Sequence, residues 1–105
     1  SGGLAAMAAA NRQKAERLYA AIDASGGFYV APVLAGHRSM VNVRFQLPDA
    51  ALTEAFLAAA EDHGLHHLRG HRQIGGVRAS LYNAMPQAGV DALTAFMADF
   101  ARRRG

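Results

Sequence analysis

The segment from residue 70 to residue 86 contains side chains suited to binding an anion. Its basic residues are His71, Arg72 and Arg78, and glycines at positions 70, 75 and 76 accompany them. An arginine guanidinium group matches a carboxylate or phosphate through two parallel hydrogen bonds. Glycine lets an anion approach backbone N–H groups closely. The segment therefore predicts an anion-binding site.

A metal site at the same place is less well supported. Histidines at positions 63, 66, 67 and 71 lie close together in the sequence, and imidazole is a common zinc ligand. If residues 65–69 form a strand, alternation sends His66 and His67 to opposite faces, and at most two of the four rings converge. The chain contains no cysteine to complete the ligand set. We therefore expect no metal.

Two kinds of catalytic loop are also not expected. Gly70 and Gly75 have the spacing of a phosphate-binding loop, but Gly76-Val77 replaces the Lys-Ser or Lys-Thr pair that such a loop requires. The serines at positions 25, 39 and 80 lack the flanking pattern of a nucleophile elbow. A P-loop nucleotide site and a serine hydrolase are both unsupported.

The elements that would position the basic residues follow from hydrophobic periodicity and turn residues. An N-cap at Asp49 and a stop at Gly64 bound one of the helices. The expected helices are 4–24, 49–63 and 86–104, and the expected strands are 28–30, 40–46, 65–69 and 77–82. The last two strands are joined by the glycine-bearing loop and predict a hairpin. This order indicates a single α+β domain over residues 1–105, in two layers, with an antiparallel sheet of three to four strands and helices packed on one face.

In the expected strand 40–46, alternation places Asn42, Arg44 and Gln46 on the polar side, opposite Val41, Val43 and Phe45. Strand alternation also places Arg78 on the polar side of its own strand. Its neighbours Val77, Ala79 and Leu81 point toward a core, so Arg78 and Ser80 face the other way. Arginine is common on the solvent side of a strand, so a surface arginine without a ligand is the alternative to an anion site.

Composition restricts the function classes. The 105 residues carry a net charge of +3, with ten arginines and one lysine, and include no cysteine. Nothing indicates an oxidising compartment, and the alanine-rich N-terminal run is too short and polar to span a membrane. We expect a cytoplasmic protein, with Ser1-Gly2-Gly3 as a cloning scar. Binding of nucleic acid is not expected, because the positive charge is modest. An RNA-binding sheet would also need exposed aromatic residues; the candidates are Phe28, Tyr29, Phe45 and Tyr82, and we expect Phe45 in the core.

Several motifs resemble the C-terminal part of the phosphoserine aminotransferase family. The resemblance runs from about residue 11 to residue 105, and the motifs have the same spacing as in the family. The motifs are Arg38-Ser39, Met40-Val41-Asn42-Val43-Arg44-Phe45, Gly64-Leu65, Gly70-His71-Arg72, Gly75-Gly76, Arg78-Ala79-Ser80, Tyr82-Asn83-Ala84-Met85-Pro86 and Gly89-Val90-Asp91-Ala92-Leu93-Thr94-Ala95-Phe96-Met97. Arg69, where the family is expected to have lysine, is a minor departure.

The resemblance implies a pyridoxal-phosphate enzyme of the fold type I, class V group, which acts as a cytoplasmic homodimer in serine biosynthesis and, in some bacteria, in pyridoxal-phosphate synthesis. It would transfer an amino group between glutamate and 3-phosphohydroxypyruvate, giving 2-oxoglutarate and phosphoserine. The residue matching Arg78 would bind the substrate carboxylate, and those matching His71 and Arg72 would hold the phosphate.

The same resemblance implies that the chain is incomplete as an enzyme. Such enzymes bind the cofactor as a Schiff base on a lysine. The sole lysine here, Lys14, lies in an ordinary helical pattern, away from any cofactor motif. We therefore expect only the small C-terminal domain, with catalytic and cofactor-binding residues in the large domain, no cofactor bound to this chain alone and no activity in isolation. The alternative is a self-standing module that binds a phosphorylated metabolite without catalysis.

Overall fold

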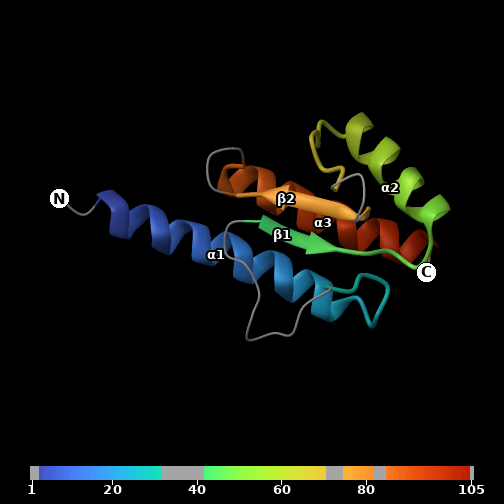
Figure 1. The fold of residues 1–105 in the computed structure, drawn as a ribbon, viewed down its shortest axis with the longest axis horizontal. Coiled ribbons are helices and arrows are strands. Elements are labelled where there is room, and N and C mark those ends of the chain that lie inside the picture. The colour runs from blue at the N-terminus through green and yellow to red at the C-terminus, as the bar shows by residue number, and fades with distance from the viewer. Residues whose placement is uncertain (1–2, 32–41, 71–74, 82–84, 105) are drawn as a thin grey trace.

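The computed structural model describes residues 3–31, 42–70, 75–81 and 85–104, with the side chains of residues 3–7 excepted. Three helices and two strands occur in these ranges (Figure 1). They are α1 (Gly3–Ala24), β1 (Asn42–Phe45), α2 (Ala50–Asp62), β2 (Val77–Ser80) and α3 (Gln87–Arg104). The α+β class is therefore as predicted.

The sheet is antiparallel, and β1 pairs directly with β2. The register places Val43 opposite Ala79 and Phe45 opposite Val77, and all four side chains are buried. Each outer edge carries one isolated bridge, Val30 with Gln46 and Arg69 with Val77. The described residues thus contain a two-stranded sheet where three to four strands were expected, and the two additional expected strands are present only as single bridges.

The segment 65–69 departs from a strand because His67 has a left-handed backbone, with a φ of 62°. A strand requires extended backbone at every residue, so one left-handed residue ends the alternation. Leu65 and Leu68 are both buried, three residues apart instead of two. The chain still joins β2, because the Arg78 N–H donates to the Leu68 carbonyl at 2.7 Å.

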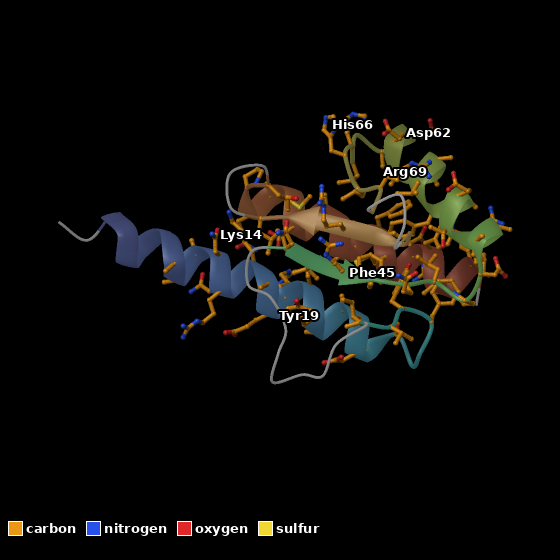
Figure 2. All side chains as sticks on the ribbon, in the orientation of Figure 1. Lys14, Tyr19, Phe45, Asp62, His66 and Arg69 are labelled. Atoms are coloured by element: carbon orange, nitrogen blue, oxygen red, sulfur yellow. The ribbon has the colours of Figure 1, made fainter. Side chains whose placement is uncertain are left out.

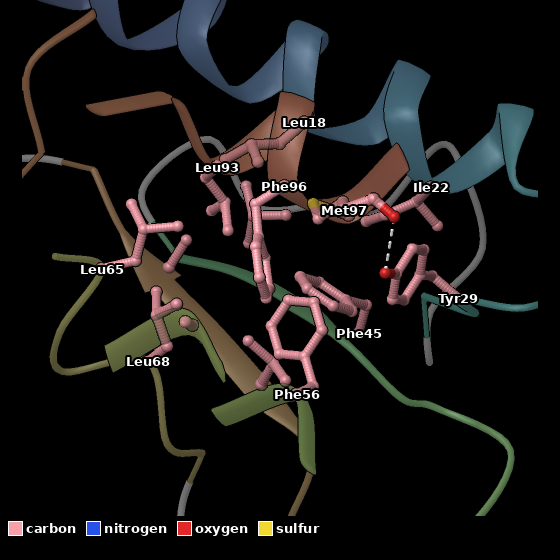
Figure 3. Packing of buried hydrophobic residues seen from close by; sticks show 14 of the residues in the cluster. Leu18, Ile22, Tyr29, Phe45, Phe56, Leu65, Leu68, Leu93, Phe96 and Met97 are labelled. Atoms are coloured by element: carbon pink, nitrogen blue, oxygen red, sulfur yellow. Dashed lines mark hydrogen bonds between the residues drawn. The ribbon is translucent and has the colours of Figure 1, made fainter. Parts of the chain in front are cut away.

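A single core lies against one face of the sheet, and all three helices contribute to it (Figure 3). Phe56 of α2 is at its centre, with its ring 5.0 Å from that of Phe96 and 5.9 Å from that of Phe45. Leu18 and Ile22 bring α1 to the same core. Rings at these separations and near-perpendicular angles form favourable edge-to-face contacts.

The bounds of α2 follow from its end residues. Asp49 is the N-cap, and its side chain accepts a hydrogen bond from the Leu52 N–H at 2.7 Å. Gly64 has a φ of 77°, the left-handed conformation that commonly follows the last helical turn. The buried residues of α2 are Phe56, Leu57 and Ala60.

Within the described part of the chain, none of the helices combines the length and apolar character that crossing a bilayer requires.

Candidate anion site

The face of the sheet opposite the core is polar. Asn42, Arg44 and Gln46 alternate with the buried residues of β1, and Arg78 and Ser80 do the same on β2. The register places Asn42 opposite Ser80 and Arg44 opposite Arg78. The Ser80 hydroxyl donates to the Asn42 side-chain oxygen at 3.0 Å. All five of these residues are half-buried, so the face is polar without being fully open to water.

Arg78 occupies a fixed position on this face. Its N–H donates to the Leu68 carbonyl on one side of β2, the strand pairs with β1 on the other side, and the flanking Val77 and Ala79 are buried. The Nε atom of Arg78 is buried and has no hydrogen-bond partner among the described residues. A buried N–H without a partner costs about 1–3 kcal/mol, more when charged, so native proteins contain few of them. This side chain is therefore held ready for an acceptor.

The glycines beside Arg78 are required by close contacts. A Cβ on Gly76 would lie 2.8 Å from the Phe45 carbonyl oxygen and from the Gln46 side chain, and its φ is 72°. A Cβ on Gly70 would overlap the carbonyl oxygen of Gly75. The Gly70 N–H donates to the Gly76 carbonyl at 3.0 Å, which closes this end of the predicted hairpin. Only glycine allows these neighbouring segments of the chain to lie this close together.

A cavity of about 600 Å³ opens at the glycine end of the polar face. Gln46 connects the two regions, because it lies on the polar face and also lines the cavity. The rest of the wall comes from the chain between β1 and α2, from the first residues of α2, and from Arg69 and the three glycines. The wall consists of Gln46, Leu47, Asp49, Ala50, Thr53, Glu54, Arg69, Gly70, Gly75 and Gly76.

An ion pair ties the cavity wall together. The two terminal nitrogens of Arg69, which is labelled in Figure 2, donate to the two carboxylate oxygens of Glu54 at 2.6 and 2.8 Å. These hydrogen bonds hold the pKa of Glu54 below its usual range and raise the pKa of Arg69. Arg69 is therefore occupied by a carboxylate of this chain, in contrast to Arg78.

The sequence-predicted site residues have different outcomes. Arg78 lies on the polar face, as alternation predicted. His71 and Arg72 lie outside the described residues, and their proposed contacts stay a prediction. Sequence reasoning identified Arg44 only as a polar-side residue of its strand. Its position opposite Arg78 depends on strand register, which no local pattern specifies.

The described histidines are all on the surface. His63, His66 and His67 are exposed, which corrects the expectation that His66 and His67 lie on opposite faces of a strand. His66 pairs with Glu61 at 2.6 Å. Among the described residues, no three metal-binding side chains come together.

Tyr29, one of the candidate aromatic residues for RNA stacking, is buried in the core. Tyr29 is 2% exposed, and its hydroxyl donates to the Met97 carbonyl at 2.8 Å (Figure 3). Phe28 is half-buried, and Tyr82 lies outside the described residues. Burial raises the pKa of the Tyr29 phenol well above its usual range.

The residues present do not fit pyridoxal phosphate. Its aldehyde requires a lysine amine, and the sole lysine of the chain, Lys14, lies on α1 (Figure 2). Lys14 is not part of the cavity wall beside the glycines. Among the described residues, the cavity wall therefore contains no group that would hold the cofactor covalently.

Comparison with known proteins places these features in a family. A family model described as aminotransferase class-V matches residues 1–93. Phosphoserine aminotransferase of Acidithiobacillus ferrooxidans is 57% identical over 104 residues, and that of Stenotrophomonas maltophilia is 55% identical. In both cases the alignment covers 99% of this chain and 29% of the relative. The chain thus spans less than a third of the length of these relatives.

Solved structures of phosphoserine aminotransferase are also similar. The structure from Bacillus circulans subsp. alkalophilus is 48% identical, with a TM-score of 0.88, and the match covers 91% of this chain and 27% of that one. A structure with bound pyridoxal phosphate from Trichomonas vaginalis is 35% identical, with a TM-score of 0.79. That match covers 86% of this chain and 26% of that one.

Proposed function

Because the chain belongs to the class-V aminotransferase family, we propose that it is the substrate-binding C-terminal domain of a phosphoserine aminotransferase. The full enzyme would transfer an amino group between glutamate and 3-phosphohydroxypyruvate. The identity to phosphoserine aminotransferases along 99% of the chain supports this substrate class. The cofactor, its lysine and the remaining catalytic groups would come from a large domain, and the full enzyme would be a cytoplasmic homodimer.

Arg78 is the residue that would bind the substrate carboxylate. The observation that carries this proposal is its buried Nε without a partner, on a polar face whose backbone is fixed from both sides. A carboxylate accepts two parallel hydrogen bonds from a guanidinium group and would give this nitrogen its acceptor. Glutamate and the keto acid both carry a carboxylate, so one arginine would serve both halves of the reaction.

His71 and Arg72 would hold the phosphate group of the phosphorylated substrate. In the sequence they lie between Gly70 and Gly75, and both of these glycines line the cavity at the end of the polar face. A substrate with a carboxylate on Arg78 and a phosphate on these residues would be held at both ends. This arrangement would favour the phosphorylated substrate over the same compound without its phosphate.

Steady-state kinetics of the full-length enzyme test both roles. Replacing Arg78 with methionine keeps most of the side-chain length and removes the charge. We expect kcat/KM to fall for glutamate and for 3-phosphohydroxypyruvate alike, by about 10- to 100-fold, since a hydrogen bond to a charged group contributes about 1.5–3 kcal/mol. Arg12→Met, on an exposed position of α1, is the control for loss of one positive charge.

The phosphate role predicts a different pattern. His71→Ala and Arg72→Ala are expected to reduce kcat/KM for 3-phosphohydroxypyruvate far more than for hydroxypyruvate, which lacks the phosphate. Equal losses for the two substrates would contradict the phosphate role. If Arg78→Met leaves both glutamate and the keto acid unaffected, the carboxylate role is wrong.

A further inference from the structure

Arg44 stands directly opposite Arg78 in the sheet. Backbone hydrogen bonds show which kind of pair this is. Gln46 exchanges both of its backbone bonds with Val30, so the backbone of Arg44, two residues earlier, also points away from β2. The Arg78 N–H donates to Leu68, away from β1. The two arginines are therefore a non-hydrogen-bonded pair, the closer type, with Cα atoms about 4.5 Å apart.

This pair places two positively charged residues opposite each other, and no ion-pair partner of either occurs among the described residues. Like charges directly opposite on one face of an antiparallel sheet are destabilising. In the described part of the chain, no carboxylate lies within ion-pair distance of either guanidinium group. The described ion pairs are Arg17–Asp91, His66–Glu61, Arg69–Glu54, Arg102–Asp99 and Arg103–Asp99.

The surroundings of the pair hold it in place. The buried residues on either side of each arginine fix the register, so the two strands cannot slip to separate the charges. Both side chains are half-buried, which weakens the screening by water that fully exposed arginines would have. Native proteins accept such local conflicts mainly where a function requires them.

We infer that Arg44 is a second anion-binding residue, which acts with Arg78 on the same substrate carboxylate. This inference rests on the proposed role of Arg78. Arg78 would supply the paired hydrogen bonds, and Arg44 would supply a second positive charge across the strand pair. The bound carboxylate would in turn relieve the repulsion between the two arginines, so binding and stability are linked.

The inference is tested on the full-length enzyme with its cofactor bound. The probe is glutarate, a dicarboxylate that has neither an amino nor a keto group and therefore binds without reacting. Calorimetric titration gives its affinity, and thermal unfolding with and without glutarate gives the stability. The variants are Arg44→Met, Arg44→Lys, Arg78→Met and the double variant, with Arg12→Met as the control. Methionine retains the apolar stem of arginine, which limits packing losses.

We expect Arg44→Met to bind glutarate roughly 5- to 20-fold more weakly than the wild type, as one unit charge a few ångströms from a carboxylate would give in a partly solvated site. Without glutarate, the same variant is expected to unfold at a higher temperature, because the repulsion is gone. Arg44→Lys keeps the charge and is expected to retain most of the affinity. The loss in Arg44→Met is also expected to shrink in high salt.

The opposite results would overturn the inference. If Arg44→Met binds glutarate as tightly as the wild type, or unfolds at a lower temperature without glutarate, Arg44 is an ordinary surface residue. No binding of glutarate by the wild type would also overturn it. An enzyme that fails to transaminate, while both Arg44→Met and Arg78→Met weaken glutarate binding, would contradict the proposed function and support the two-arginine site.

Discussion

At the scale of single residues, the proposed site depends on Arg78, whose buried Nε has no hydrogen-bond partner among the described residues, and on the glycines beside it. Sequence alternation was sufficient to place Arg78 on the polar face, because a strand has only two faces. Alternation did not predict that Arg78 lies opposite Arg44, because strand register depends on pairing between residues 34 positions apart in the chain. The unpartnered Nε is likewise a property of the packed structure.

The close contact at Gly76 gives a prediction for stability. Gly76→Ala is expected to lower the free energy of unfolding by about 1–3 kcal/mol, because a Cβ would meet the Phe45 carbonyl and a left-handed φ is unfavourable for alanine. Gly75→Ala is the matched control, with a φ of 73° and no atom within 4 Å of the added Cβ. Urea unfolding of the chain measures both. Equal losses in the two variants would show that the contact contributes nothing.

At the scale of elements, local signals predicted helices better than strands. The N-cap at Asp49 and the stop at Gly64 were correct because capping depends on neighbouring residues. The expected strand at 65–69 is a single bridge, because the left-handed His67 interrupts it and no residue pattern signalled that conformation. For β1, the structure confirms the predicted alternation at residues 42–46, while Met40 and Val41 lie outside the described residues.

Tyr29 connects the segment after α1 to α3 and predicts a loss of stability at high pH. Its hydroxyl donates to the Met97 carbonyl, and burial raises the pKa of the phenol in the folded state. The stabilisation of the neutral phenol is fully present below the ordinary pKa of about 10, and it is lost as the pH rises above that value.

Tyr29→Phe separates this effect from other titrations. At pH 8 we expect the variant to be less stable by about 0.5–1.5 kcal/mol, the contribution of one hydrogen bond. Between pH 8 and pH 11 its free energy of unfolding, measured in urea, is expected to fall less steeply than that of the wild type. Identical slopes for the two proteins would contradict a role for the buried phenol.

At the scale of the whole molecule, the fold separates two tasks between the faces of its sheet. One face packs against a core to which all three helices contribute, and the other presents the two opposed arginines next to a glycine-lined cavity. The sequence indicated this division, because apolar and polar residues alternate in both strands. In the proposed function, this chain would supply the anion-binding groups and the large domain would supply the cofactor.

The central claim, that Arg78 binds the substrate carboxylate, is tested most directly by a crystal structure of the full-length enzyme with glutarate. We predict that one carboxylate of glutarate accepts hydrogen bonds from the Arg78 guanidinium group, with the buried Nε as one of the donors. A structure in which both carboxylates bind elsewhere, and the Arg78 Nε still has no acceptor or bonds to a protein group, would contradict the claim.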